Sequence, residues 1–223
     1  MRGLRDNALT IVFGAIFLVS VVGQSFAGQH DFNEEQVAHN GDPVSWLDYV
    51  LSSDFGRALL ENWQSEYLQF VLFIFFTIWL VQRGSNESKV PGREGLESDE
   101  DQRVGAYAPP DAPRWAKVRS WRLHLYSSSL LLVMLVLFLG SWLGQSVTGW
   151  RTYNDVRREH DQPSVSYGDY LLRPDFWEAT LQNWQSEFLA VGSMAIFTVY
   201  LRQRGSPESK PVGAPHEETA SSG

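Results

Sequence analysis

No cysteine occurs in this chain of 223 residues, which excludes disulfides, thiolate nucleophiles and thiolate-bound metals. Positive charge is also scarce, because 18 Lys and Arg stand against 26 Asp and Glu, for a formal net charge of −8. The basic residues are not gathered into a patch on a folded domain. We therefore expect no nucleic-acid partner.

Recognisable catalytic patterns are missing as well. The sequence has no glycine-rich loop for phosphate, no Ser-His-Asp set and no paired-carboxylate hydrolase pattern. Its five histidines form no His-x-x-x-His pair that would suit a metal. We therefore expect a non-enzymatic protein with no cofactor and no metal, and a membrane enzyme is the least favoured class.

What the chain has instead is long segments without a charged residue, at 8–27, 67–81, 127–143 and 188–201. A helix of about 20 apolar residues crosses the ~30 Å hydrocarbon core of a bilayer. The sequence therefore predicts an all-α membrane protein. Its four transmembrane helices are expected at about 6–28, 63–82, 122–148 and 184–203.

The second half of the chain repeats the first. Asn62-Trp63-Gln64-Ser65-Glu66 recurs 121 residues later as Asn183-Trp184-Gln185-Ser186-Glu187, and 31 of the 67 residues in 23–89 recur in 144–210 without a gap. This predicts two tandem helical hairpins of the same orientation, related by a pseudo-two-fold axis along the membrane normal. We divide the chain into repeat 1 (1–92, external segment 29–62), a disordered cytoplasmic linker (93–120), repeat 2 (121–206, external segment 149–183) and a disordered tail (207–223).

The first apolar segment has a second interpretation. Arg2 and Arg5 precede it, and Ser25-Phe26-Ala27 is similar to the cleavage site of a secretory signal. Its counterpart at 125–149 lies deep inside the chain, however, and carries the same Gly-Gln-Ser at its far end. The repeat therefore favours a retained helix over a cleaved signal.

The basic residues predict the orientation in the membrane. Of the 18 Lys and Arg, 13 fall in the N-terminus, in 83–122 and in the C-terminal tail. Because Lys and Arg near membrane spans favour the cytoplasm, we expect both termini and the linker inside and both external segments outside. Each external segment should carry short amphipathic helices, since Ser45 and Ser166 each precede an aspartate by three residues and Pro174 is typical of a helix start.

A polar cluster is predicted at the outer end of the spanning helices. Trp63 lies about 20 helical residues before Arg83, which marks the predicted inner end of the span. Glu66 lies about 25 Å from that end. Asn62, Ser65 and Glu66 share one helix face, which should point into the bundle because polar groups in hydrocarbon need partners. The predicted cluster contains Gln24, Ser25, Asn62, Gln64, Ser65, Glu66, Gln145, Ser146, Asn183, Gln185, Ser186 and Glu187.

Two interpretations of this cluster stay open. Polar side chains between membrane helices commonly hold the helices together, at ~0.6–2 kcal/mol per hydrogen bond. Glu66 and Glu187 fit that role less well, because a carboxylate at membrane depth is a candidate proton or cation site. Each could also be an interfacial carboxylate that reaches water. The expected interfacial anchors are Trp63, Tyr67, Trp184, Phe188, Arg83 and Arg204, and His39 and His160 are expected to be surface histidines rather than metal ligands.

The pentapeptide, followed after an apolar run by Gln-Arg-Gly-Ser-x-Glu-Ser-Lys, resembles a family of bacterial integral membrane proteins catalogued as a domain of unknown function. This resemblance implies a multi-pass protein of the bacterial inner membrane and supplies no activity. We expect a scaffold or accessory protein whose partners are the bilayer and a second copy or another membrane protein. The alternative is a small proton or cation channel or transporter that uses Glu66 and Glu187.

Overall fold

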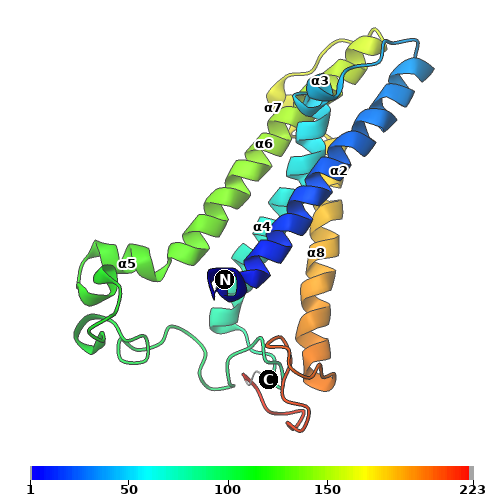
Figure 1. Ribbon diagram of the computed structural model, residues 1–223. Coiled ribbons are helices and arrows are strands. Elements are labelled where there is room, and N and C mark those ends of the chain that lie inside the picture. The colour runs from blue at the N-terminus through cyan, green and yellow to red at the C-terminus, as the bar shows by residue number, and fades with distance from the viewer. Residues whose placement is uncertain (1, 221–223) are drawn as a thin grey trace. The chain divides into compact units, whose positions relative to one another are not determined.

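A computed structural model describes residues 2–220 and contains only helices and turns in that range (Figure 1). The α-helices are α1 (Arg2–Asp6), α2 (Ala8–Ala38), α3 (Trp46–Val50), α4 (Ser53–Trp79), α5 (Trp121–Ser127), α6 (Ser129–Glu159), α7 (Tyr167–Tyr170) and α8 (Pro174–Tyr200). Two 3₁₀ turns, η1 (Gly105–Tyr107) and η2 (Arg114–Lys117), lie between α4 and α5. The predicted all-α class is therefore confirmed, while residue 1 of the first repeat and residues 221–223 of the predicted tail lie outside the described range.

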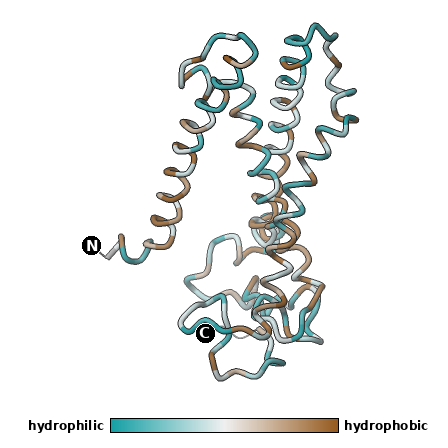
Figure 2. Tube along the Cα trace, turned by 90° about the vertical axis from the view of Figure 1, so that its right-hand side faces the viewer, coloured by the Kyte–Doolittle hydropathy of each residue, from teal (hydrophilic) through white to brown (hydrophobic). Residues whose placement is uncertain are grey.

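Two of the described helices, α2 and α6, are long and apolar enough to cross a membrane. Figure 2 shows hydrophobic residues along the first part of α2, which begins beside the N-terminus, and hydrophilic residues beyond it. Helices α4 and α8 have 27 residues each, which corresponds to about 40 Å of rise. In each, the charged residues lie in the first half of the helix, and the apolar segment follows.

The long helices differ from their predicted bounds. Helix α2 continues to Ala38 and α6 to Glu159, about three turns into the segments predicted to be external. A helix can continue past the end of the hydrocarbon, because its backbone hydrogen bonds are internal in water and in lipid alike. The predicted span at 122–148 is instead divided, since α5 ends at Ser127 and α6 begins at Ser129.

The chain divides into two compact units, of which the first contains the segments up to Leu60 and Gly144–Leu171. Its two turns are fastened by the same hydrogen bonds 121 residues apart. The side-chain amide of Asn33 donates to the Val44 carbonyl at 3.0 Å and accepts from the Val44 amide at 2.7 Å. Asn154 holds Val165 in the same way, at 3.1 and 2.8 Å.

The predicted caps of the short helices in the segments at 29–62 and 149–183 are confirmed. The Ser45 hydroxyl accepts the Asp48 amide at the start of α3, and the Ser166 hydroxyl accepts the Asp169 amide at the start of α7, both at 3.2 Å. Helix α8 starts at Pro174, as its sequence predicts.

The second unit contains the segments from Glu61 to Leu143 and from Leu172 onward. Its core joins α4 to the first half of α6, where Leu68 and Val71 pack with Phe138. Trp142 on α6 and Trp184 on α8 border this core, with their ring centroids 6.5 Å apart. The spacing of these α4 residues places them on one helix face.

A matching turn follows α4 and α8 in the second unit. The Ser88 hydroxyl accepts the Gln82 amide, and the Ser209 hydroxyl accepts the Gln203 amide, both at 2.8 Å. Gly84 and Gly205 have φ values of 88° and 82°, which only glycine adopts readily. The repeated Gln-Arg-Gly-Ser-x-Glu-Ser-Lys motif therefore forms a defined turn rather than an extended tether.

Candidate functional site

Two serines of the predicted cluster bond to aromatic side chains of the segments predicted to be external. The Trp46 indole donates to the Ser25 hydroxyl at 3.0 Å, and the Ser146 hydroxyl and the Tyr167 hydroxyl are 2.6 Å apart. Ser25 and Ser146 are buried, as is Gln145, while Gln24 is half-buried. These serines belong to the predicted cluster, whereas Trp46 and Tyr167, which occupy equivalent positions in the two repeats, do not.

On α4, the buried polar residues are Gln64 and Ser65, at 0% and 1% exposure. The Gln64 side-chain oxygen accepts the Trp184 indole N–H at 2.8 Å, and its amide donates to the Glu61 carbonyl at 3.1 Å. The Ser65 hydroxyl donates to the Asn62 carbonyl at 2.9 Å. Gln64 thus joins α4 to α8 within the second unit.

The buried face of α4 differs from the one predicted. Asn62 and Glu66 are exposed, and Gln64 takes the inward position instead. The reason is packing, since the apolar contacts of Leu68 and Val71 fix the rotation of α4, and Gln64 lies on the same side as Leu68 four residues later.

The equivalent residues on α8 have the opposite environment. Gln185 and Ser186 are exposed on the surface of the chain, although their sequence neighbours are the same as those of Gln64 and Ser65. The Ser186 hydroxyl bonds to the Asn183 carbonyl of its own helix at 2.8 Å, and the half-buried Asn183 amide donates to the Ala179 carbonyl at 2.8 Å. Five identical residues therefore have two different environments.

The two glutamates of the pentapeptides lie near each other. Glu187 is half-buried and lies close enough to interact with the charge of Glu66 and with the Ser65 side chain. The exposed Glu66 and the half-buried Glu187 are thus brought together by α4 and α8, although the chain separates them by 121 residues.

The predicted anchors occupy several environments. Trp63 and Tyr67 are half-buried and Tyr67 packs against the core, while Phe188 is 40% exposed. Arg83 and Arg204 are exposed. These positions are compatible with interfacial anchoring, which stays a prediction.

A polar cavity of about 350 Å³ in the first unit was not predicted. His39 and His160 border it with their ring centroids 6.4 Å apart, together with Asp54 and Glu159. Burial raises the pKa of the Asp54 carboxyl, which the charge of Arg57 opposes. Within residues 2–220, no three His, Asp or Glu side chains are placed to hold a metal ion. The one feature of the sequence that indicates this cavity is the recurrence of His39 as His160 in the second repeat.

Neither the curated proteins nor the solved structures gave a match to this chain. A family model described as "Domain of unknown function (DUF6766)" matches residues 1–221. Because this match spans almost the whole sequence, the chain belongs to the DUF6766 family.

Proposed function

We propose that this protein is a non-enzymatic, multi-pass protein of the bacterial plasma membrane that acts as a scaffold or accessory subunit and associates with itself through α8. In this proposal α2, α4, α6 and α8 cross the membrane as two parallel hairpins. Both termini and the linker lie in the cytoplasm, as the distribution of Lys and Arg favours.

One observation carries the proposed self-association, namely the contrast between the two Gln-Ser pairs. Gln64 is fully buried and accepts a hydrogen bond from Trp184, whereas Gln185 is exposed. An amide that faces lipid loses its hydrogen bonds to water, which costs several kcal/mol unless a neighbouring helix replaces them. A second copy of the chain can supply that helix, and each hydrogen bond gained contributes ~0.6–2 kcal/mol.

The test is to replace the exposed pair by apolar residues of similar size. Gln185→Leu/Ser186→Ala should weaken self-association by about tenfold, equivalent to about 1.4 kcal/mol. Association is measured by analytical ultracentrifugation in detergent and by energy transfer between labelled copies in lipid vesicles. A wild-type chain that stays monomeric in both would refute the proposal.

The matched control is the same change in the first repeat. Gln64→Leu/Ser65→Ala removes the acceptor of the Trp184 indole, so it should lower the stability of the chain itself by ~1–3 kcal/mol. If both double variants alter association equally, the exposed face of α8 is not the interface.

A second candidate function, a small proton or cation channel, is supported by the proximity of Glu187 to Glu66 and Ser65. Glu66→Gln/Glu187→Gln keeps the shape and hydrogen bonding of both side chains but removes their charge. If the protein is a scaffold, this variant should fold and assemble normally, while leucine at both positions should disrupt folding and assembly more strongly. The measurement is the flux of protons or monovalent cations into proteoliposomes. Flux with the wild-type protein and none with the glutamine variant would favour the channel.

A further inference from the structure

The matched turns after α4 and α8 bring together two acidic residues that the polar cluster does not include. Glu87 and Glu208 are equivalent residues of the two repeats, and their side chains are within hydrogen-bonding reach of each other. The Asn86 side-chain amide donates to the Pro207 carbonyl at 3.5 Å and so joins the two turns. The first turn also bonds to the C-terminal tail, since the Gly84 amide donates to the Thr219 hydroxyl at 2.8 Å and the Ala220 amide donates to the Ser85 carbonyl at 3.1 Å. The Ser85 and Thr198 hydroxyls are 3.0 Å apart and buried.

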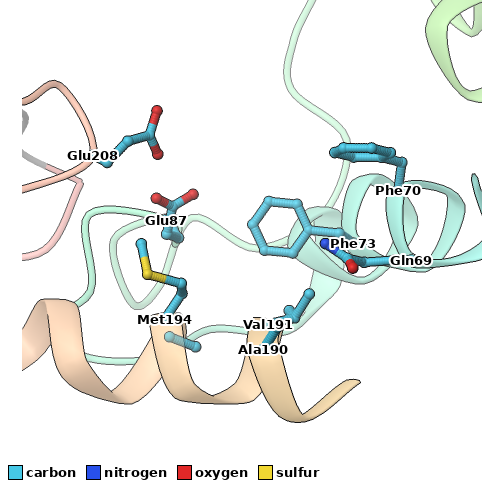
Figure 3. Close-up of a pocket in the computed structure, with 9 residues that line it drawn as sticks. Gln69, Phe70, Phe73, Glu87, Ala190, Val191, Met194 and Glu208 are labelled. Carbon is cyan, nitrogen blue, oxygen red and sulfur yellow. The ribbon is translucent and has the colours of Figure 1, made fainter. Parts of the chain in front are cut away.

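These carboxylates border an apolar cavity of about 190 Å³ between α4 and α8. Phe70 and Phe73 line it from α4, and Val191 and Met194 line it from α8. Figure 3 shows the Glu87 carboxylate between Glu208 and Met194, with the Phe73 ring beside it. The walls of the cavity are thus mostly apolar, with Gln69 as a further polar lining residue, and one end is acidic.

No cation of residues 2–220 forms an ion pair with either carboxylate. The lysines of the two motifs have other partners. The Lys89 ammonium bonds to the Gly95 carbonyl and to Glu97. The Lys210 ammonium donates to the carbonyls of Pro215, His216 and Glu218 at 2.9–3.1 Å. Two neighbouring carboxylates therefore share one site without a counter-ion from the chain, and burial together with Glu208 raises the pKa of the Glu87 carboxyl.

We propose that this cavity binds a small organic ammonium, with its charge between Glu87 and Glu208 and its apolar substituent against Phe70, Phe73 and Met194. The two carboxylates complement a positive charge, and Phe73 adds the attraction of an aromatic face for a cation. A metal ion fits less well, because Mg²⁺ and Ca²⁺ take six or more oxygen ligands and the walls here are apolar. The volume lies below the ~300–1,000 Å³ of sites for drug-sized ligands, which favours a small amine.

The probe is benzyltrimethylammonium, titrated into the full chain in detergent by calorimetry, with empty micelles as the blank. Saturable binding is expected in the wild type, and Glu87→Gln/Glu208→Gln should weaken it at least tenfold. Ala190→Phe keeps both charges but fills the cavity, so it should also abolish binding. The matched control is Glu100→Gln/Glu217→Gln, which removes two exposed charges and should leave the affinity unchanged.

The anionic analogue benzenesulfonate and the neutral benzyl alcohol should not bind. Titration in nanodiscs distinguishes a soluble amine from a lipid headgroup of the same chemistry. If a lipid ammonium enters the site, the probe should bind more weakly in nanodiscs of phosphatidylethanolamine than in nanodiscs of phosphatidylglycerol. If only a soluble amine enters, its affinity should be the same in both. The proposal is overturned by no saturable binding up to millimolar probe, by equal binding of benzenesulfonate, or by unchanged affinity in Glu87→Gln/Glu208→Gln.

Discussion

Gly28 and Gly149 lie against tyrosine rings. Because glycine has no Cβ atom, each ring can approach the helix backbone more closely than any other residue would allow. A Cβ atom added to Gly28 would lie 3.0 Å from Cζ of Tyr49, and one added to Gly149 would lie 3.3 Å from Cζ of Tyr170. Both tyrosines are buried, so their rings have little room to move. The two close contacts occupy equivalent positions in the repeats and fasten α3 to α2 and α7 to α6.

We predict that Gly28→Ala and Gly149→Ala each destabilise the chain by about 1–3 kcal/mol, because overpacking exceeds the gain of up to ~1 kcal/mol in helix propensity. Thermal unfolding in detergent measures the change. Gly14→Ala and Gly140→Ala are matched controls, since a Cβ at either position has no neighbour within 4 Å. These controls should be neutral or slightly stabilising, and an equal loss in all four variants would contradict the tyrosine contact.

Glu87 gives the stability of the chain a pH dependence. Its pKa is raised in the folded chain, so above the ordinary value of 4.5 the folded state keeps a proton that the unfolded state has lost. The stability of the folded state therefore falls as the pH rises above 4.5. Glu87→Gln should therefore flatten the decline of the melting temperature above that pH. Glu94→Gln is the control of opposite sign, since the Gly92 amide lowers the pKa of the Glu94 carboxyl and its contribution is lost as pH falls. A steeper decline in Glu87→Gln would contradict this assignment.

At the scale of the element, the side chains of Asn33 and Asn154 determine where the chain returns after α2 and α6. The asparagine side chain bonds to both the N–H and the carbonyl of a valine 11 positions away, and Gln29 or Trp150 adds a second bond to the same carbonyl. Neither asparagine belonged to the predicted cluster, although both recur in the repeat. Their role depends on contact with a residue eleven positions away, which helical periodicity does not reveal.

We predict that Asn33→Ala and Asn154→Ala each cost ~1–3 kcal/mol, because the backbone N–H of Val44 or Val165 loses its acceptor. The valine carbonyls keep a second donor, the Gln29 amide in the first turn and the Trp150 indole in the second. Hydrogen exchange should accelerate at the amide of Val44 in the first variant and at that of Val165 in the second. Asn7→Ala is the control, since its side chain bonds only to the Gly3 carbonyl of an exposed turn. Unchanged protection at Val44 and Val165 would show that other contacts close these turns.

At the scale of the whole molecule, the orientation in the membrane can be measured directly because the chain has no native cysteine. Single cysteines at positions 40, 100 and 160 should react with an impermeant thiol reagent in intact cells only at 40 and 160. The physical reason is the concentration of Lys and Arg in the termini and the linker. Lysed cells provide the control, in which all three positions should react, and labelling of position 100 in intact cells would refute the topology.

The sequence by itself determined the helical class, the two apolar helices, the serine-capped starts of α3 and α7 and the proline start of α8. These features depend on residues within a few positions of one another, where hydrophobicity, serine caps and proline act locally. The bonds of Ser25 to Trp46 and of Asn33 to Val44, and the proximity of Glu87 to Glu208, depend on residues that only folding brings together. The two pentapeptides show the difference most directly, because identical residues have identical local preferences. Only packing against Trp184 and the α6 core decides that Gln64 is buried while Gln185 is exposed.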